Sequence, residues 1–159
     1  MSFYYVLRKD IHMKKVSDVL QAKGNREIWS VTSTATVHDA LKMMDEKNVG
    51  ALLVIDEGKL VGIISERDYA RRLLLQGKSP SDTKVKDIMT NNLYGVSPDI
   101  GIEECMMLMT EKRVRHLPVF EGDHLIGVIS IGNIVKSIIQ HQDILIDNLQ
   151  AYIMGKYGN

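Results

Sequence analysis

The sequence has a single cysteine, no excess of either charge and no long hydrophobic run. One cysteine, Cys105, cannot form an intrachain disulfide or a metal site built from several thiolates. Twenty basic and twenty acidic residues give a formal net charge of zero, so the chain lacks the basic excess typical of nucleic-acid-binding proteins. No stretch approaches the roughly 18 consecutive apolar residues that a membrane-spanning helix needs. We therefore expect neither a nucleic-acid partner nor a membrane partner.

The composition is that of a globular protein. The 159 residues are 45% hydrophobic and 25% charged, enough for one ordinary domain or two small domains that share an interface. In the N-terminal stretch MSFYYVLRKD, the charges follow the short apolar run, which is the wrong order for a secretory signal. We expect a cytoplasmic protein.

The chain contains an internal duplication. Residues 31–68 align with residues 96–133 without a gap, and 11 of the 38 aligned positions are identical. The segments before the two copies, VSDVL (16–20) and VKDIM (85–89), also correspond, and we call them the lead-ins. The period is too long for a solenoid repeat, so the pattern indicates two copies of one folding unit.

Each copy predicts the same order of elements. An apolar stripe at helical spacing occurs in both copies, formed by Val37, Ala40, Leu41 and Met44 in the first and by Ile102, Cys105, Met106 and Met109 in the second. Thr36 and Asp39 form a capping-box pattern at the start of the first of these helices. The apolar runs ALLVI and LVGIIS around DEGK, and LPVF and LIGVIS around EGDH, predict hairpins, and each hairpin is followed by a further helix. The predicted unit is strand, helix, strand, strand, helix, and one such unit has too little core to be stable alone.

Three motifs carry a family resemblance: VKDIMT, RVRHLPV and the paired junctions GIISERD (62–68) and GVISIGN (127–133). Together they resemble a tandem CBS-domain pair, or Bateman module, of the stand-alone bacterial signal-transduction type, over about residues 14–138. The resemblance implies an α/β fold with two pseudo-symmetric units packed sheet to sheet, here with a C-terminal helix. Relatives of this type are associated with AMP and nicotinamide dinucleotides, and they usually form dimers.

This reading divides the chain into four parts. The first CBS repeat is expected at 14–78 and the second at 79–138. A C-terminal helical extension would cover 139–159, after an N-terminal segment at 1–13. The apolar positions beyond residue 135 exceed what one unit needs, so the last helix covers its own unit or pairs in a dimer.

The junction Ser65-x-x-Asp68 has two interpretations. In the first, the serine and the acid only cap the following helix. In the second, which the resemblance favours, the Asp68 carboxylate accepts both hydrogens of a ribose diol, with Ser65 and Arg67 beside the ribose or phosphate. In the second copy, Ser130 and Asn133 stand at these positions, and an uncharged amide oxygen is the weaker acceptor.

The residues that do not repeat predict the remainder of the site. Gly50 and Ala51 align with Arg115 and His116. One strand edge therefore carries small residues and the other carries cationic side chains. Small residues would leave room for a flat base, while the cations would meet a phosphate. His116 could instead be a polar core residue. The walls of the base pockets are predicted from four apolar side chains, Val49, Ile64, Val114 and Ile129.

These observations predict a regulatory module that binds adenine nucleotides and signals by conformational change. The expected ligands are AMP, NAD(H) or another adenosine-containing nucleotide, with no obligatory cofactor, no metal and no catalytic residues. A homodimer and an unidentified downstream protein are the expected partners. The alternative is a small structural or interaction protein whose Ser-x-x-Asp junctions are only helix caps.

Overall fold

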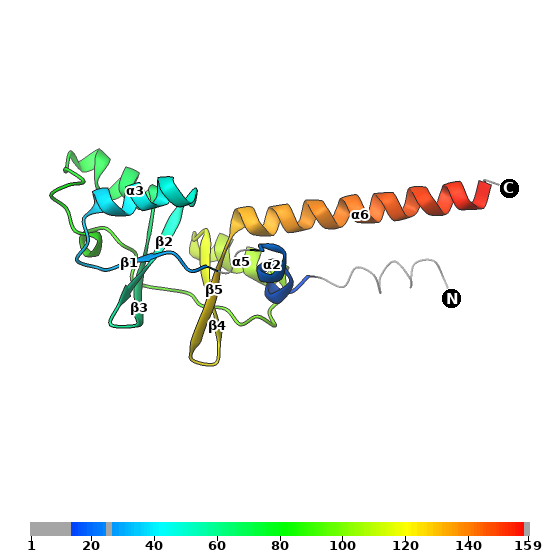
Figure 1. Cartoon of the computed structure of the whole chain (residues 1–159), viewed down its shortest axis with the longest axis horizontal. Coiled ribbons are helices and arrows are strands. Elements are labelled where there is room, and N and C mark those ends of the chain that lie inside the picture. The colour runs from blue at the N-terminus through cyan, green and yellow to red at the C-terminus, as the bar shows by residue number, and fades with distance from the viewer. Residues whose placement is uncertain (1–13, 25–26, 158–159) are drawn as a thin grey trace. The chain divides into compact units, whose positions relative to one another are not determined.

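The computed structural model describes residues 14–24 and 27–157 (Figure 1). The chain divides into two compact units. The central unit is residues 27–94, and the flanking unit combines residues 14–24 with residues 95–157. The predicted N-terminal segment 1–13 and the last two residues of the predicted extension lie outside the described residues.

The central unit is a three-stranded sheet covered by helix α3. Strand β1 (Ser30–Val31) pairs in parallel with β2 (Ala51–Asp56), and β2 pairs antiparallel with β3 (Lys59–Ser65). Glu57 and Gly58 take positive φ angles of 48° and 78° in the hairpin turn, the conformation that two-residue hairpin loops favour. Helix α3 (Val37–Lys47) buries the predicted stripe in a core shared with Leu52, Val54 and Ile64, which confirms the helix. Helix α4 (Glu66–Arg72) and the 3-10 turns η1 (Leu74–Gln76) and η2 (Val85–Asp87) complete the unit.

The flanking unit contains the second hairpin, β4 (His116–Glu121) and β5 (His124–Ser130), with α2 (Val16–Ala22) and α5 (Ile102–Lys112). It ends in α6 (Ile131–Tyr157), whose C-terminal part extends away from the hairpin (Figure 1). Across 14–24 and 27–157, no helix is long and apolar enough to cross a membrane.

The predicted first strand of the second copy is reduced to a single bridge between Val96 and Val119. In the central unit, the Leu53 N–H donates to the Trp29 carbonyl at 3.2 Å and lengthens the pairing of β1. Pro118 occupies the position of Leu53 in the second copy, and proline has no N–H to donate. The bonds of Val96 with Pro118 and Phe120, both 2.9 Å, are what remains of the strand.

The lead-ins are exchanged between the two copies. The lead-in of the second copy lies in the central unit, where Val85 and Lys86 donate to the carbonyls of Ala35 and Ser33 at 2.9 and 3.0 Å. The lead-in of the first copy makes the corresponding bonds in the flanking unit, from Val16 to Ile100 and from Ser17 to Pro98, both 2.9 Å. The repeats expected at 14–78 and 79–138 are divisions of the sequence and stay a prediction, since the compact units cross those boundaries.

A glycine in the third strand makes room for each lead-in. Ile63 and Thr90 exchange two backbone hydrogen bonds of 2.9 and 2.8 Å, which bring the lead-in against β3. A Cβ on Gly62 would lie 2.6 Å from Met89 Sδ and 3.1 Å from the Thr90 carbonyl oxygen. At the equivalent Gly127, a Cβ would lie 2.9 Å from Leu20 Cδ2. The shared glycine of GIIS and GVIS is therefore explained by close approach of the lead-in.

Gly62→Ala should destabilise the protein by about 1–3 kcal/mol, because the added methyl must displace Met89 against a fixed carbonyl. Urea denaturation of the full chain measures the change. Gly132→Ala is the control, because its Cβ would meet nothing closer than Ser130 Oγ at 3.6 Å and the residue is helical. Equal stabilities of the two variants would contradict the role assigned to Gly62.

Candidate functional site

The first candidate site is the junction where β3 ends and α4 begins. Ser65 is the N-cap of α4, with extended backbone angles, and its Oγ accepts a hydrogen bond from the Asp68 N–H at 3.2 Å. In return, Asp68 Oδ2 accepts from both the N–H and the hydroxyl of Ser65 at 2.9 Å. The capping function predicted from Ser65-x-x-Asp68 is thus confirmed.

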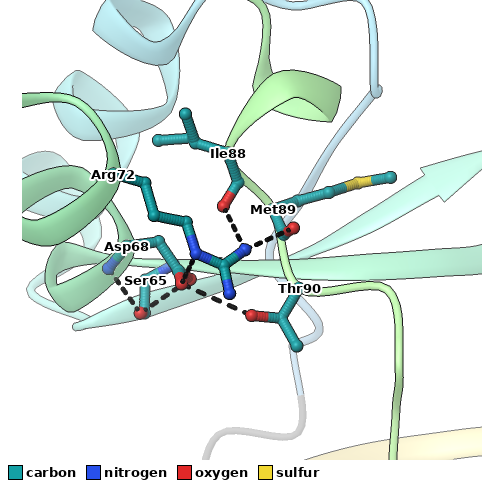
Figure 2. A network of polar contacts seen from close by, with 6 residues as sticks. All are labelled: Ser65, Asp68, Arg72, Ile88, Met89 and Thr90. Carbon is teal, nitrogen blue, oxygen red and sulfur yellow. Dashed lines mark hydrogen bonds and ion pairs between the residues drawn. The ribbon is translucent and has the colours of Figure 1, made fainter. Parts of the chain in front are cut away.

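The other oxygen of the Asp68 carboxylate faces two further side chains (Figure 2). The Thr90 hydroxyl donates to Asp68 Oδ1 at 3.4 Å, and Arg72 Nε lies 3.8 Å from the same oxygen. Arg72 also donates to the carbonyls of Ile88 and Met89, at 3.1 and 3.0 Å. The Asp68 side chain is only 14% exposed, so the carboxylate is held in a fixed position beside a positive charge.

Sequence reasoning missed Arg72 and Thr90. Arg72 could have been found, because a residue four positions after Asp68 lies on the same face of a helix. Thr90 could not, because it belongs to VKDIMT, which precedes the second copy in the sequence. Only the exchange of lead-ins brings Thr90 to the junction of the first copy.

The second junction repeats the cap without the charges. Asn133 Oδ1 accepts from the Ser130 N–H at 2.9 Å, and the Asn133 N–H donates to Ser130 Oγ at 3.1 Å. The position that corresponds to Arg72 is Ser137, which is buried. The flanking unit therefore has neither a carboxylate nor a guanidinium at these two positions.

The non-repeating residues lie beside the junction of their own unit. The Gly50 carbonyl accepts from the Glu66 N–H at 3.0 Å, and Ala51 pairs with Ser65. In the flanking unit, the Arg115 carbonyl accepts from the Ile131 N–H at 2.9 Å, and His116 pairs with Ser130. Each strand edge is therefore adjacent to a helix start, as the sequence alignment of the copies implies. Whether the cationic edge and Asp68 serve one ligand stays a prediction.

The remaining predicted residues differ in their access to a ligand. Val49 and Val114 are half-buried, and Arg67 is half-buried on α4 outside the hydrogen-bond network of Asp68. Ile64 and Ile129 are 0% exposed and belong to the cores of their units. A fully buried side chain presents no surface to a base.

Two observations concern the reactivity of the single cysteine and the binding of metal ions. Burial and the neighbouring charge of Glu104 raise the pKa of the Cys105 thiol, and a protonated thiol is a poor nucleophile. Within 14–24 and 27–157, no three His, Cys, Asp or Glu side chains gather in a way that could hold a metal ion.

Known proteins share both the sequence pattern and the fold. The chain is 42% identical over 151 residues to the mitochondrial CBS domain-containing protein CBSX3 of Arabidopsis thaliana, covering 89% of this chain and 73% of that protein. A solved CBS-domain protein from Burkholderia ambifaria, assigned to signal transduction, superposes with a TM-score of 0.77 at 49% identity, covering 79% of this chain and 94% of that one.

A third relative was solved with ligands. The CBS domain pair of protein MJ0100, in complex with 5′-methylthioadenosine and S-adenosyl-L-methionine, superposes with a TM-score of 0.68 at 26% identity, covering 79% of this chain and 96% of that one. The family model for the CBS domain matches twice, at residues 16–75 and 85–140. These tandem matches confirm the resemblance and the α/β fold that it implied, and the chain belongs to the CBS-domain family.

Proposed function

We propose that the central unit binds the adenosine part of a nucleotide at the Ser65–Asp68 junction, and that the chain is a regulatory module without chemistry of its own. The observation that carries the proposal is the Asp68 carboxylate, fixed by a helix cap and by Thr90 and located next to Arg72.

The cap leaves the carboxylate able to bind a ribose. A carboxylate has about four lone-pair sites on its two oxygens. Oδ2 is used by Ser65, but Oδ1 receives only the long 3.4 Å bond from Thr90 and the more distant Arg72 contact. In this proposal, a ribose hydroxyl replaces the Thr90 hydroxyl as the donor to Oδ1. Capping and ribose binding are therefore compatible at Asp68.

The other parts of a nucleotide would use the strand edges. In this proposal, Gly50 and Ala51 leave room for the base in the central unit, where Val49 supplies an apolar contact. Val114 is the corresponding residue of the flanking unit, and the Ile64 and Ile129 side chains are fully buried. Arg115 and His116 bind a phosphate. Asn133 makes the second junction the weaker ribose site because its amide carries no charge.

The ligands of protein MJ0100 support the adenosine part of this proposal. Both 5′-methylthioadenosine and S-adenosyl-L-methionine contain adenine and ribose, and neither contains a phosphate. The part that these two ligands share is adenosine, and the groups attached to it differ. AMP and NAD(H) are our proposed ligands for this chain, because Arg115 and His116 would add a phosphate site.

A nucleotide that binds one conformation of the chain more tightly than another would shift the population of chains toward that conformation. Regulation would follow from this shift. The competing hypothesis is an interaction protein whose junctions only cap helices, and the observed caps agree with both. Cytoplasmic location and an unidentified downstream protein stay predictions.

Asp68→Ala should weaken binding of AMP, NADH or S-adenosylmethionine by at least about tenfold, because hydrogen bonds to a charged group contribute about 1.5–3 kcal/mol. Asp68→Asn, which copies the second junction, should keep the cap and still lose affinity. Calorimetry on the full chain measures both.

The control for this experiment is Asp39→Ala. Asp39 stands at the third position of α3, where it bonds to the N-cap Thr36 at 2.8 Å. Both alanine variants should lose about 1 kcal/mol of stability, but only the Asp68 variant should lose affinity. If the wild type binds none of the three ligands, or if both variants bind equally well, the junctions are helix caps alone.

The phosphate assignment is tested with AMP against adenosine. The wild type should bind AMP at least about tenfold more tightly, and His116→Ala or Arg115→Gln should remove much of that difference because a charge-assisted hydrogen bond is lost. His124→Ala is the control, an exposed histidine at the opposite end of the same hairpin. Equal binding of AMP and adenosine by the wild type would remove the phosphate site but leave the role of Asp68 intact.

A further inference from the structure

A second carboxylate lies beside the Ser65–Asp68 junction of the central unit. Glu66 is the first residue of α4, and its N–H donates to the Gly50 carbonyl at 3.0 Å. This bond fixes the start of the helix against the residue that precedes β2. The Glu66 side chain also lies next to Gly50, since Oε2 is 3.9 Å from the place where a Cβ on Gly50 would be.

The Glu66 carboxylate is available to a ligand. Within residues 14–24 and 27–157, no group forms a hydrogen bond or an ion pair with it, and Glu66 is exposed. Asp68, in contrast, is engaged by Ser65, Thr90 and Arg72. A carboxylate accepts hydrogen bonds and has none to donate, so Glu66 can bind a ligand group that carries N–H donors.

The fold does not require glycine at position 50. Its φ angle is not positive, and the one neighbour that the described residues place within 4 Å of an added Cβ is Glu66 Oε2, at an ordinary contact distance. This differs from Gly62, where an added Cβ would come within 2.6 Å of Met89 Sδ. The missing side chain at Gly50 therefore leaves open surface beside a free acceptor.

The aligned contact of the flanking unit keeps the backbone bond and changes both side chains. The Arg115 carbonyl accepts from the Ile131 N–H at 2.9 Å, so Arg115 takes the place of Gly50 and Ile131 takes the place of Glu66. The open surface and the acceptor therefore occur together only at the junction of the central unit.

The edge of a purine base determines what Glu66 can bind. Adenine carries an amino group at C6, which donates hydrogen bonds, whereas a 6-oxopurine carries a carbonyl oxygen there, which only accepts. A carboxylate oxygen accepts from the amino group and repels the carbonyl oxygen. A base that lies over Gly50 has the Glu66 carboxylate at its edge.

We propose that Glu66 recognises the base of the nucleotide, with its carboxylate accepting a hydrogen bond from the 6-amino group of adenine while the ring lies over Gly50. Glu66 is then a specificity-determining residue, and the central unit selects 6-aminopurine nucleotides over 6-oxopurine nucleotides. This inference rests on the proposed function, which places adenosine at the same junction. Asp68 cannot make this selection, because every ribonucleotide presents the same ribose to it.

The test compares AMP with IMP, which share ribose and phosphate and differ in the base. Calorimetry on the full chain should show that the wild type binds AMP at least about tenfold more tightly, because a hydrogen bond to a charged group is lost with IMP. Glu66→Gln should reduce this preference to about threefold or less, because a glutamine amide can accept from an amino group or donate to a carbonyl oxygen.

The control for Glu66→Gln is Glu57→Gln. Glu57 is an exposed glutamate in the turn at the opposite end of the same hairpin. The same change of charge at that position should leave the preference for AMP as it is in the wild type.

Gly50→Ala tests where the base lies. The added methyl fits the folded protein, so the variant should be at least as stable as the wild type. If the base covers Gly50, the methyl should weaken binding of AMP and IMP alike by at least about tenfold, because the ring can no longer approach the backbone. Unchanged affinity for AMP overturns this placement of the base.

The outcomes separate this inference from the proposed function. If the wild type binds AMP and IMP equally, or if Glu66→Gln keeps the preference, Glu66 does not recognise the base, and the role of Asp68 stands because both nucleotides contain ribose. Tighter binding of GMP than of AMP overturns the adenine assignment, because guanine can turn an N1–H and a 2-amino group toward a carboxylate. If the wild type binds no purine nucleotide, the proposed function and this inference fail together.

Discussion

The backbone contact at Gly62 holds residues 85–90 against β3, and the arrangement of the central unit depends on it. Two hydrogen bonds between Ile63 and Thr90 place a segment from outside the first copy directly beside that copy's third strand. A Cβ at Gly62 would lie 2.6 Å from Met89 Sδ and 3.1 Å from the Thr90 carbonyl oxygen, so glycine is the residue that fits this approach without a shift. Once docked, the segment presents the carbonyls of Ile88 and Met89 to Arg72 and the Thr90 hydroxyl to Asp68 (Figure 2). The same contact therefore completes the core and positions the carboxylate.

The two copies show how one local structure can be kept while its chemistry changes. Both junctions satisfy the first backbone groups of a helix with a serine and a short polar side chain. A cap requires only a hydrogen-bond acceptor, which aspartate and asparagine both supply. Charge is an additional property, and only the first copy has it, together with the arginine that offsets it. A helix cap alone therefore does not require the carboxylate of Asp68 in place of the amide of Asn133.

Local patterns in the sequence predicted most of the fold. The stripe beginning at Val37 is sufficient to predict α3, because an amphipathic helix needs only its own spacing, and DEGK predicts its hairpin because the turn needs glycine. The exchange of lead-ins was not predictable in this way. VSDVL and VKDIM have similar sequences, and neither contains a residue that indicates which copy it packs against. The shortened strand at Val96 depends on Pro118, a partner more than twenty residues away. The pocket walls predicted at Ile64 and Ile129 stay a prediction, and the sequence does not show that the core occupies their face of the strand, where both side chains are fully buried.

The exchange of lead-ins also bears on the order in which the chain folds as it leaves the ribosome. The central unit is one continuous segment, Glu27–Tyr94, so all of its contacts become possible as soon as that segment has emerged. The flanking unit is split around it: α2 is synthesised early, while the carbonyls of Pro98 and Ile100 that receive it are made only after the whole central unit. Contacts between distant parts of a chain form late because they require a long loop to close. During synthesis, the apolar side of α2 therefore has no partner until residues 98–100 have emerged.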